Sequence, residues 1–408
     1  MNDKEITKEY WMKKLVNKET TIKIAAESLG LSTRQVKRIK KGYIEKGVES
    51  IIHGNLNRKP KHAIPVEVKG KIKELKTSEK YNEANFSHFY DLIKEEELAD
   101  EKIEYVTVYK ILREAGIKSN RKHRKEKQHH RRKRLEAFGK MIQIDATPYD
   151  WFGIGKRYNI HGGIDDATGR ITGLYMTENE SLEGYYNMME RTFKNYGRPV
   201  SIYSDRHLIL QPKDKLTIEE ELAGEKAREC QFSRAMKELN IKMIRAYSPQ
   251  AKGRIERLWG TLQSRLPVEF KIKGIQTIEE ANKYLEVYIK RYNKRFEVNC
   301  EGIENIFREM PEGIETKYCL CRKEYRKLNS GGTIHIVNKT FKVLTAEIPY
   351  GTIVEVLISK KIGIKVRYKE KYYKTELFED RSRETQYGEL TILINKMLSE
   401  SIKEASGF

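Results

Sequence analysis

Three acidic residues in the middle of the 408-residue chain have the type and spacing that metal-dependent phosphoryl transfer requires: Asp145, Asp205 and Glu256. Asp145 lies in the alternating segment 143–147, where it shares one face with Gln143. Asp205 ends an apolar segment, and strand ends of this kind line the ligand crevice of open α/β sheets. An oxygen-only ligand set suits Mg²⁺ or Mn²⁺ rather than zinc. Two such ions about 3.5–4 Å apart can activate a water or a hydroxyl and stabilise the leaving oxygen of an in-line displacement.

The third acid lies on a predicted helix, 254–266, beside the apolar stripe of that helix. Gly260 follows Glu256 by one turn and removes side-chain bulk, which predicts a close approach of the helix to a sheet. Simpler interpretations remain for all three acids. Glu256 could pair with Arg257 or Lys252, and the two aspartates could cap turns.

Short β-branched or apolar segments alternate with helical patterns between residues 140 and 300. The predicted strands are 141–147, 157–165, 171–176, 199–205 and 241–246. The predicted helices are 181–197, 230–239 and 254–266. The first three strands are expected to be antiparallel, and the alternation that follows predicts a mixed five-stranded α/β sheet. The polar and acidic segment 208–228 interrupts this rhythm and is expected to be a surface insertion.

Two helical blocks are predicted before the sheet, at residues 1–60 and 61–120. In the first block, a break at Gly30 and a helix-capping Ser32 lead into a basic helix over 33–41. This pattern predicts a DNA-binding helix-turn-helix, although a small helical hairpin with a solvated basic face has the same pattern. Four outward-facing side chains of the basic helix are the predicted DNA contacts: Arg34, Gln35, Arg38 and Lys41.

The second block ends in a helical segment in which Val108, Ile111 and Leu112 are predicted to face inward, with Thr107 as the N-cap. This block could be a second helix-turn-helix module.

The charge of the chain predicts a polyanionic partner. Lys and Arg exceed Asp and Glu by 80 − 59 = 21, and only 38% of the residues are hydrophobic. The segment 121–139 is predicted to be a basic arm, because residues 121–134 hold nine Lys or Arg and one Glu, a net charge of 9 − 1 = +8. Such a run binds phosphates through counterion release without reading sequence. Its predicted DNA contacts are Arg121, Lys122, Arg124, Lys125, Arg131, Arg132, Lys133 and Arg134.

The C-terminal part of the chain is predicted to contain a connector at 301–330, a small β-barrel at 331–380 and a tail at 381–408. The four cysteines cannot staple a chain of this size and fit a reducing cytoplasm. The closest pair, Cys319 and Cys321, has no second pair nearby and is interpreted as free thiols. With no apolar run long enough to span a bilayer and a charged start, an integral membrane or exported protein is not expected.

Four segments together resemble the catalytic core of insertion-sequence DDE transposases of the ISNCY type, which is related to the retroviral integrase core. These segments are 143–145, 163–169, 203–207 and 248–257, and the N-terminal blocks and the basic arm also match. The resemblance implies an RNase H-like fold, DNA strand transfer, and a metal-binding catalytic triad formed by Asp145, Asp205 and Glu256. The chain departs from retroviral integrases in two ways: the gap between the second and third acids is longer, and no Cys-His zinc module precedes the core, so zinc is not expected.

Other residues near the acids have lesser predicted roles. Asp165 and Asp166 are expected to shape a hairpin turn, and Trp259 is expected to be a core residue. His207 could orient a phosphate or a water, although a lone histidine is more often structural. Three cations that flank Glu256 are predicted to contact DNA phosphates: Lys252, Arg254 and Arg257.

The sequence thus predicts a multidomain transposase of the bacterial cytoplasm or nucleoid. It would bind the terminal inverted repeats of its element, cleave the 3′ ends and join them to target DNA, with two Mg²⁺ ions per site that Mn²⁺ can replace. Because two transposon ends must be joined, we expect at least a homodimer on double-stranded DNA, and no membrane partner. The rival interpretations are an inactive DNA-binding regulator with the same fold and an RNase H-type nuclease.

Overall fold

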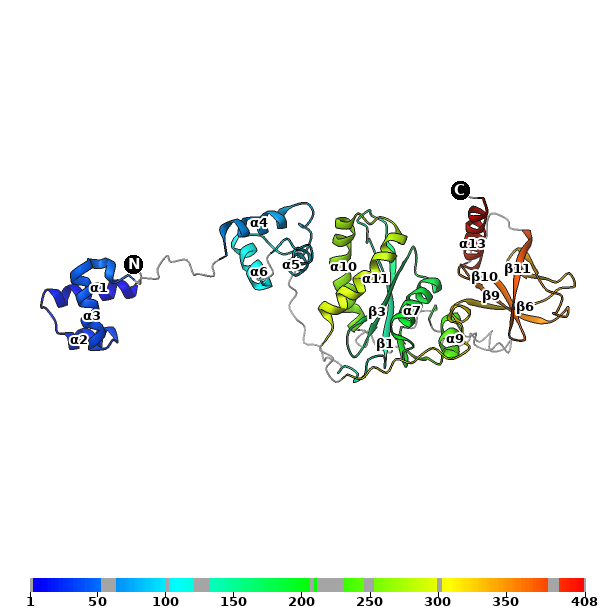
Figure 1. Cartoon of the computed structure of the whole chain (residues 1–408), viewed down its shortest axis with the longest axis horizontal. Helices are drawn as coiled ribbons and strands as arrows, with labels where there is room; N and C mark the ends of the chain where they lie inside the picture. Colours follow the sequence, from blue (N-terminus) through cyan, green and yellow to red (C-terminus); the bar gives the residue numbers. More distant parts are fainter. Residues whose placement is uncertain are drawn as a thin grey trace, which may run out of the picture. The chain divides into compact units, whose positions relative to one another are not determined.

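The computed structural model of the chain describes residues 3–52, 64–99, 103–120, 133–205, 209–210, 230–245, 253–298, 303–380 and 389–406. The chain divides into two compact units, Met1–Glu74 and Leu75–Phe408 (Figure 1).

The first unit is built from short helices. These are α1 (Asp3–Val16), α2 (Ile22–Leu29), α3 (Thr33–Lys46) and the 3-10 turn η1 (Gly47–Ser50). Gly30 ends α2 in the left-handed conformation with φ of 62°, and Ser32 caps α3. Val36 is fully buried in the core of this unit. The predicted helix boundaries at Gly30 and Ser32 are therefore confirmed.

Further helices precede the sheet: α4 (Val66–Thr77), which crosses the boundary between the units, α5 (Phe86–Glu95) and α6 (Tyr105–Glu114). Val108, Ile111 and Leu112 of α6 are buried, as predicted. The predicted cap at Thr107 is wrong, because α6 begins at Tyr105 and Thr107 already lies in its first turn.

The central sheet of the second unit has the strand order β3-β2-β1-β4-β5. The strands are β1 (Ile142–Tyr149), β2 (Tyr158–Asp165), β3 (Ile171–Thr177), β4 (Ser201–Ser204) and β5 (Lys242–Arg245). Strand β2 is antiparallel to both β1 and β3, whereas β4 runs parallel to both β1 and β5. The predicted mixed five-stranded sheet is confirmed.

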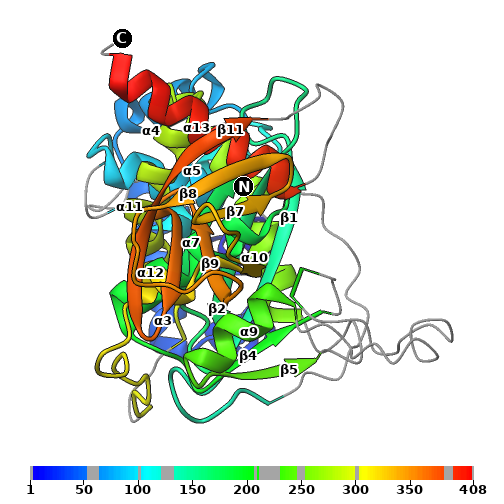
Figure 2. The ribbon, with the colours of Figure 1, turned by 90° about the vertical axis from the view of Figure 1, so that its right-hand side faces the viewer.

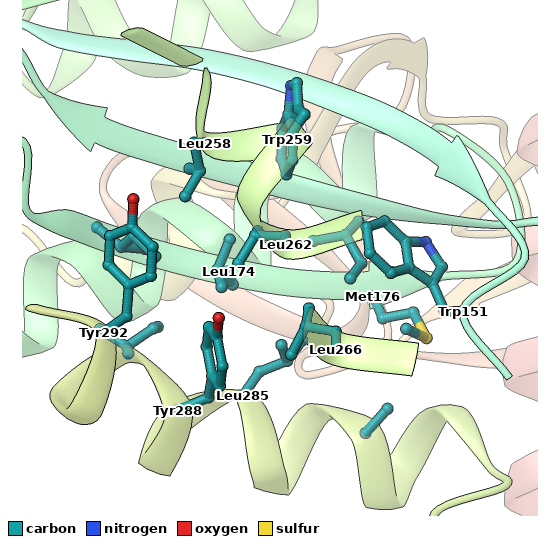
Figure 3. Packing of buried hydrophobic residues seen from close by; sticks show 14 of the residues in the cluster. Trp151, Leu174, Met176, Leu258, Trp259, Leu262, Leu266, Leu285, Tyr288 and Tyr292 are labelled. Carbon is teal, nitrogen blue, oxygen red and sulfur yellow. The ribbon is translucent and has the colours of Figure 1, made fainter. Parts of the chain in front are cut away.

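Helices pack on both faces of this sheet. The helices are α7 (Leu182–Tyr196), α9 (Gln231–Glu238), α10 (Gly253–Lys273) and α11 (Ile278–Phe296). Ile142 and Ile144 of β1 lie in one apolar cluster with side chains of α7 and α9. On the opposite face, α10 packs against β1 and β2 and α11 packs along β3, and Trp259, Leu262 and Leu266 of α10 belong to the apolar cluster that these elements share (Figure 3).

Two features of these helices differ from the sequence prediction. The predicted end of α10 at Leu266 is wrong, because the helix continues through Pro267. Val268, Glu269 and Phe270 are buried, and this packing outweighs the loss of one backbone hydrogen bond at the proline. Helix α11 was not predicted, although its capping box of Thr277 and Glu280 is a sequence signal. Among the described helices, none is long and apolar enough to cross a membrane.

The close approach of α10 to the sheet depends on a glycine of the sheet. A Cβ atom at Gly162 of β2 would lie 2.6 Å from the ring of Trp259. The prediction that Gly260 allows this approach is wrong, because a Cβ atom there would meet no atom within 4 Å. The bulk of Trp259 is therefore accommodated by β2 and not by its own helix.

The C-terminal part is an antiparallel six-stranded sheet with the strand order β6-β9-β10-β11-β8-β7. After the short helix α12 (Thr316–Cys319), the strands are β6 (Arg322–Lys327), β7 (Thr333–Ile336), β8 (Lys339–Val343), β9 (Ile353–Ser359), β10 (Gly363–Tyr368) and β11 (Lys371–Asp380). Its two edge strands are linked by the Arg326 side chain, which donates to the carbonyl oxygen of His335, so the sheet is nearly closed into a barrel. The strands curve round a core to which helix α13 (Glu389–Ser406) adds Ile394 and Met397 (Figure 2). The sheet begins inside the segment predicted as a connector, and α13 had no sequence prediction.

Candidate active site

Helix α10 is fixed along β1 by side chains that leave the strand on one face. Three hydrogen bonds, which we call the β1–α10 ladder, join the two elements: Ile255 N to Gln143 Oε1 at 3.3 Å, Trp259 Nε1 to Asp145 Oδ2 at 3.1 Å, and Gln263 Nε2 to Thr147 Oγ1 at 3.3 Å. Two residues along a strand advance about 6.6 Å and four along a helix about 6.0 Å, so the two spacings nearly match. The ladder therefore sets both the height and the rotation of α10 against β1.

Two of the three predicted catalytic acids lie on β1 and directly after β4, which are neighbouring parallel strands. Gln143 of β1 is paired in register with Tyr203 of β4. Asp145 and Asp205 each follow two residues later, which brings them level with one another. Asp145 shares its face with Gln143, as the alternation in the sequence predicted.

A buried phenol lies near both aspartates. Tyr185 of α7 is fully buried, and its hydroxyl donates to Glu180 Oε1 at 2.8 Å. Burial raises the pKa of Tyr185 well above its ordinary value, the charge of Glu180 and the hydrogen bond to it add to this rise, and Asp145 and Asp205 contribute less. The phenol is therefore neutral, and it donates its proton to Glu180.

Glu256 lies in the first turn of α10 and is exposed. It directly follows Ile255, whose backbone N–H forms the first rung of the β1–α10 ladder. Within the part of the chain that the structure describes, no three His, Cys, Asp or Glu side chains are grouped as the ligands of a metal ion. The three acids thus come from adjoining elements without forming a closed ligand set.

The first turn of α10 also contacts a buried polar cluster centred on Asp166. Asp166 Oδ1 accepts from Arg254 Nε at 2.6 Å and from Gln143 Nε2 at 2.9 Å, and Oδ2 accepts from the backbone N–H of Leu135 at 3.1 Å. Asp166 is fully buried and Arg254 is 9% exposed. The structure therefore places Arg254 in an internal ion pair, whereas the sequence predicted an exposed contact for a DNA phosphate.

The neighbouring carboxylate has a local role. Asp165 accepts hydrogen bonds from the backbone N–H and the hydroxyl of Thr168 and from the backbone N–H of Gly139. Burial raises its pKa, and these hydrogen bonds oppose the rise. The prediction that Asp165 shapes the hairpin turn is confirmed. Asp166 lies in the same turn and also contacts segments that are distant in sequence. Trp259 is 6% exposed in the main core, as predicted.

The remaining predicted DNA contacts are partly described. Arg34, Gln35, Arg38 and Lys41 are exposed on α3, and the side chain of Gln35 also completes the capping box with Ser32. Lys133 and Arg257 are exposed, and Arg134 donates to the carbonyl oxygens of Asp166 and Ala167. The other predicted positions lie outside the described residues: Arg121, Lys122, Arg124, Lys125, Arg131, Arg132, His207 and Lys252. Nearly all of the predicted insertion at 208–228 lies outside them too.

The described cysteines are free thiols at the junction of α9, α12 and β6. Cys230 caps α9, and Cys319 and Cys321 are buried. Burial raises the pKa of Cys319 to about 11 and that of Cys321 to about 12, so both are protonated at neutral pH.

The other end of α10 carries a buried cluster that the sequence did not reveal. Glu269 is 1% exposed and accepts hydrogen bonds from His88 Nε2 of α5 at 3.0 Å, from Arg291 at 3.0 Å and from the hydroxyl of Tyr284. Burial alone would raise the pKa of Glu269, but the hydrogen bond from His88 and the charge of Arg291 outweigh it and lower the pKa. Asp91 of α5 adds an ion pair to Arg265 at 2.9 Å. No sequence signal predicts these contacts, because their partners are up to 181 residues apart.

The comparisons with known proteins identify the family. The transposase for insertion sequence IS1202 of Streptococcus pneumoniae is 35% identical over 370 residues, which cover 82% of this chain and 77% of that protein. The putative transposase y4bF of Sinorhizobium fredii is 29% identical over 407 residues, covering 98% of this chain and 86% of that protein. No family model matches the chain. The chain belongs to the insertion-sequence transposases, and its function is that of a transposase, an enzyme of the polynucleotidyl transferase class.

Two solved structures show lower similarity. A simian T-cell lymphotropic virus intasome chain is 15% identical with a TM-score of 0.32, and the match covers 69% of this chain and 97% of that one. An HTLV-2 integrase catalytic core domain in complex with magnesium is 16% identical with a TM-score of 0.30, and the match covers 41% of this chain and 95% of that one.

Proposed function

We propose that the chain cleaves the 3′ ends of its insertion sequence and transfers them into target DNA, with Asp145, Asp205 and Glu256 as the ligands of two Mg²⁺ ions. The observation that carries this proposal is the level position of Asp145 on β1 and Asp205 directly after β4, beside a helix that the β1–α10 ladder fixes to β1. Membership of the transposase family supplies the reaction class.

The donor chemistry of these residues fits a hard divalent cation. All three side chains offer carboxylate oxygens, and none of the three is buried, in contrast to Asp165 and Asp166. A bound pair of ions would polarise the phosphate and lower the pKa of the attacking water. The HTLV-2 integrase core was solved with magnesium, which agrees with the same choice of metal here.

The chain's own residues orient this ligand set. Trp259 donates its indole N–H to one oxygen of Asp145 and so limits the rotation of that carboxylate. Water and the freed 3′-hydroxyl would act as successive nucleophiles in one site, so no covalent intermediate with the protein is required.

DNA binding follows from the distribution of positive charge. The exposed cations of α3 are proposed to bind the terminal repeats in a helix-turn-helix manner, and the basic arm to bind phosphates without reading sequence. Each chain has one set of three acids, whereas transposition joins two ends. We therefore propose at least a dimer on DNA.

The testing experiment is cleavage and joining of labelled DNA that carries the ends flanking the gene, with Mg²⁺, Mn²⁺ or EDTA. Wild-type protein is compared with Asp145→Asn and Glu256→Gln. Glu279→Gln is the matched control, because Glu279 is an exposed glutamate in the first turn of the neighbouring helix α11.

Metal-dependent joining that is lost in both variants and kept in the control supports the proposal. Tight end binding without cleavage under any metal would instead favour a regulator that has lost activity. Cleavage of any duplex or hybrid, without preference for the ends, would favour a nuclease.

A further inference from the structure

We propose that Asp166 is a positioning residue for strand transfer: it holds the first turn of α10 against β1 and thereby sets where Glu256 lies relative to Asp145. The inference rests on the proposed function, since it concerns two of the three proposed metal ligands. Asp166 itself touches neither metal nor DNA in this proposal.

Asp166 joins three segments that are distant in sequence. Its carboxylate accepts from Arg254 of α10, from Gln143 of β1 and from the backbone of Leu135, which precedes the sheet. Its own backbone N–H donates to the carbonyl oxygen of Met141 at 3.0 Å. A fully buried carboxylate with this set of partners fixes the geometry of all three segments at once.

The carboxylate holds the first turn of α10 in two ways. It binds Arg254 directly, and it orients the Gln143 amide, whose oxygen accepts the backbone N–H of Ile255. The first backbone N–H groups of a helix have no partner within the helix, so this hydrogen bond satisfies one of them from the sheet. Glu256 is the next residue, and it moves with this turn.

The same contacts reach the first proposed ligand. Gln143 is two residues from Asp145 on the same face of β1, and Asp145 accepts from Trp259 one turn after Ile255. Asp166 therefore supports the first rung of the β1–α10 ladder, and that rung lies closest to Glu256.

Stability alone does not account for this cluster. A buried ion pair is often no more stable than apolar residues of the same volume. Arg254 Nη2 is buried and finds no hydrogen-bond partner among the described residues, which adds a cost that an apolar contact would avoid. The cluster is therefore weak evidence for stability, whereas it fixes the position of the helix turn that the proposed reaction needs.

Asp165 provides the matched control. It is fully buried, adjacent in sequence and hydrogen-bonded within the turn and to Gly139, with no hydrogen bond to α10 in the described structure. Asp165→Asn and Asp166→Asn therefore make the same chemical change at two adjacent buried residues.

The experiment uses the full chain in four measurements: the affinity for Mn²⁺ by calorimetry, amide hydrogen exchange in residues 253–259, the rate of end joining, and the affinity for end DNA. For Asp166→Asn we expect Mn²⁺ affinity to fall roughly tenfold, as for other outer-shell partners of metal ligands. Exchange in the first turn of α10 should rise, the joining rate should fall, and the affinity for end DNA should stay within about twofold. Asp165→Asn should change none of these below its unfolding temperature.

A second pair of variants covers the case in which Asp166→Asn does not fold. Arg254→Lys keeps a charge for Asp166 and should keep most of the Mn²⁺ affinity, whereas Arg254→Gln should lose it. Wild-type Mn²⁺ affinity and wild-type exchange in Asp166→Asn, or equal losses in Asp165→Asn, would overturn the inference. A wild-type protein that neither binds Mn²⁺ nor joins ends would overturn the proposed function itself, and the exchange measurement would still show whether Asp166 holds the turn.

Discussion

Glu256 in the first turn of α10 is exposed, whereas Glu269 near the other end of the same helix is almost completely buried. The first follows the first rung of the β1–α10 ladder, and the second accepts hydrogen bonds from α5 and α11. The two glutamates show that the environment of a carboxylate is decided by its neighbours and not by its helix. One end of α10 carries the acid that we propose as a metal ligand, and the other end fixes the helix in place.

The largest effect is expected at the exposed end. Glu256→Gln should lower the rate of strand transfer by roughly a thousandfold, about 4 kcal/mol in the barrier, because metal-based stabilisation of the transition state is lost. The thermal midpoint should stay that of the wild type, since Glu256 is solvent-exposed. Parallel joining assays and thermal denaturation measure both quantities. A large fall in the midpoint would mean that Glu256 is structural, and the contrast between the two ends would fail.

A Glu→Gln substitution at the buried end should lower stability and leave the joining rate nearly unchanged. Glu269→Gln should lower the free energy of unfolding by about 3 kcal/mol, because His88 and Arg291 lose the charge that they face. The joining rate per folded molecule should change little. Urea denaturation provides the free energy.

The control for that experiment is Glu83→Gln, which breaks an ion pair between Glu83 and Lys271 whose side chains are 57% and 46% exposed. Exposed pairs contribute less than about 1 kcal/mol, so the control should be close to wild type. Equal losses in Glu269→Gln and Glu83→Gln would contradict the view that burial makes the difference.

A smaller effect is expected where the exposed end contacts the sheet. Gly162→Ala places a Cβ atom against Trp259 and should cost about 1–3 kcal/mol of stability through overpacking. It should also slow joining, because Trp259 must move away from Asp145. Gly260→Ala, on the open side of the helix, should instead raise stability by about 0.5–1 kcal/mol. Denaturation curves should show a lower free energy of unfolding for Gly162→Ala and a higher one for Gly260→Ala. An unchanged free energy of unfolding in Gly162→Ala would contradict the close approach of Trp259 to β2.

The smallest effect is a dependence on pH at the buried end. Burial lowers the pKa of His88 below its ordinary value of 6.5, so below that pH the unfolded chain binds a proton that the folded chain does not. Stability should therefore fall as the pH drops through 6.5. His88→Gln can still donate to Glu269 but cannot titrate, so its thermal midpoint should change less between pH 7.5 and pH 5.5 than that of the wild type. Identical changes in the two proteins would exclude His88 as a cause.

The sequence predicted the sheet because its signals are local. Ile142 and Ile144 alternate with Gln143 and Asp145, and the structure places the two pairs on opposite faces. Trp259 was correctly predicted as a core residue from its place in an apolar stripe.

Contacts whose partners are distant in sequence were not predicted. The ion pair of Arg254 has its carboxylate partner 88 residues earlier. The fixed end of α10 depends on His88, 181 residues away, and the predicted helix ended at Leu266, before Glu269. Such pairs leave no periodic pattern, so no reading of local spacing could have found them.

The β1–α10 ladder has a consequence for how related chains can diverge. The height and rotation of α10 are set by Gln143, Asp145 and Thr147, and not by the length of chain that separates Asp205 from Glu256. Insertions and deletions in that stretch are therefore compatible with an unchanged position of Glu256. A single residue inserted between Ile255 and Trp259 is a different matter, because it would turn the rest of the helix by about 100° and leave only one rung in place.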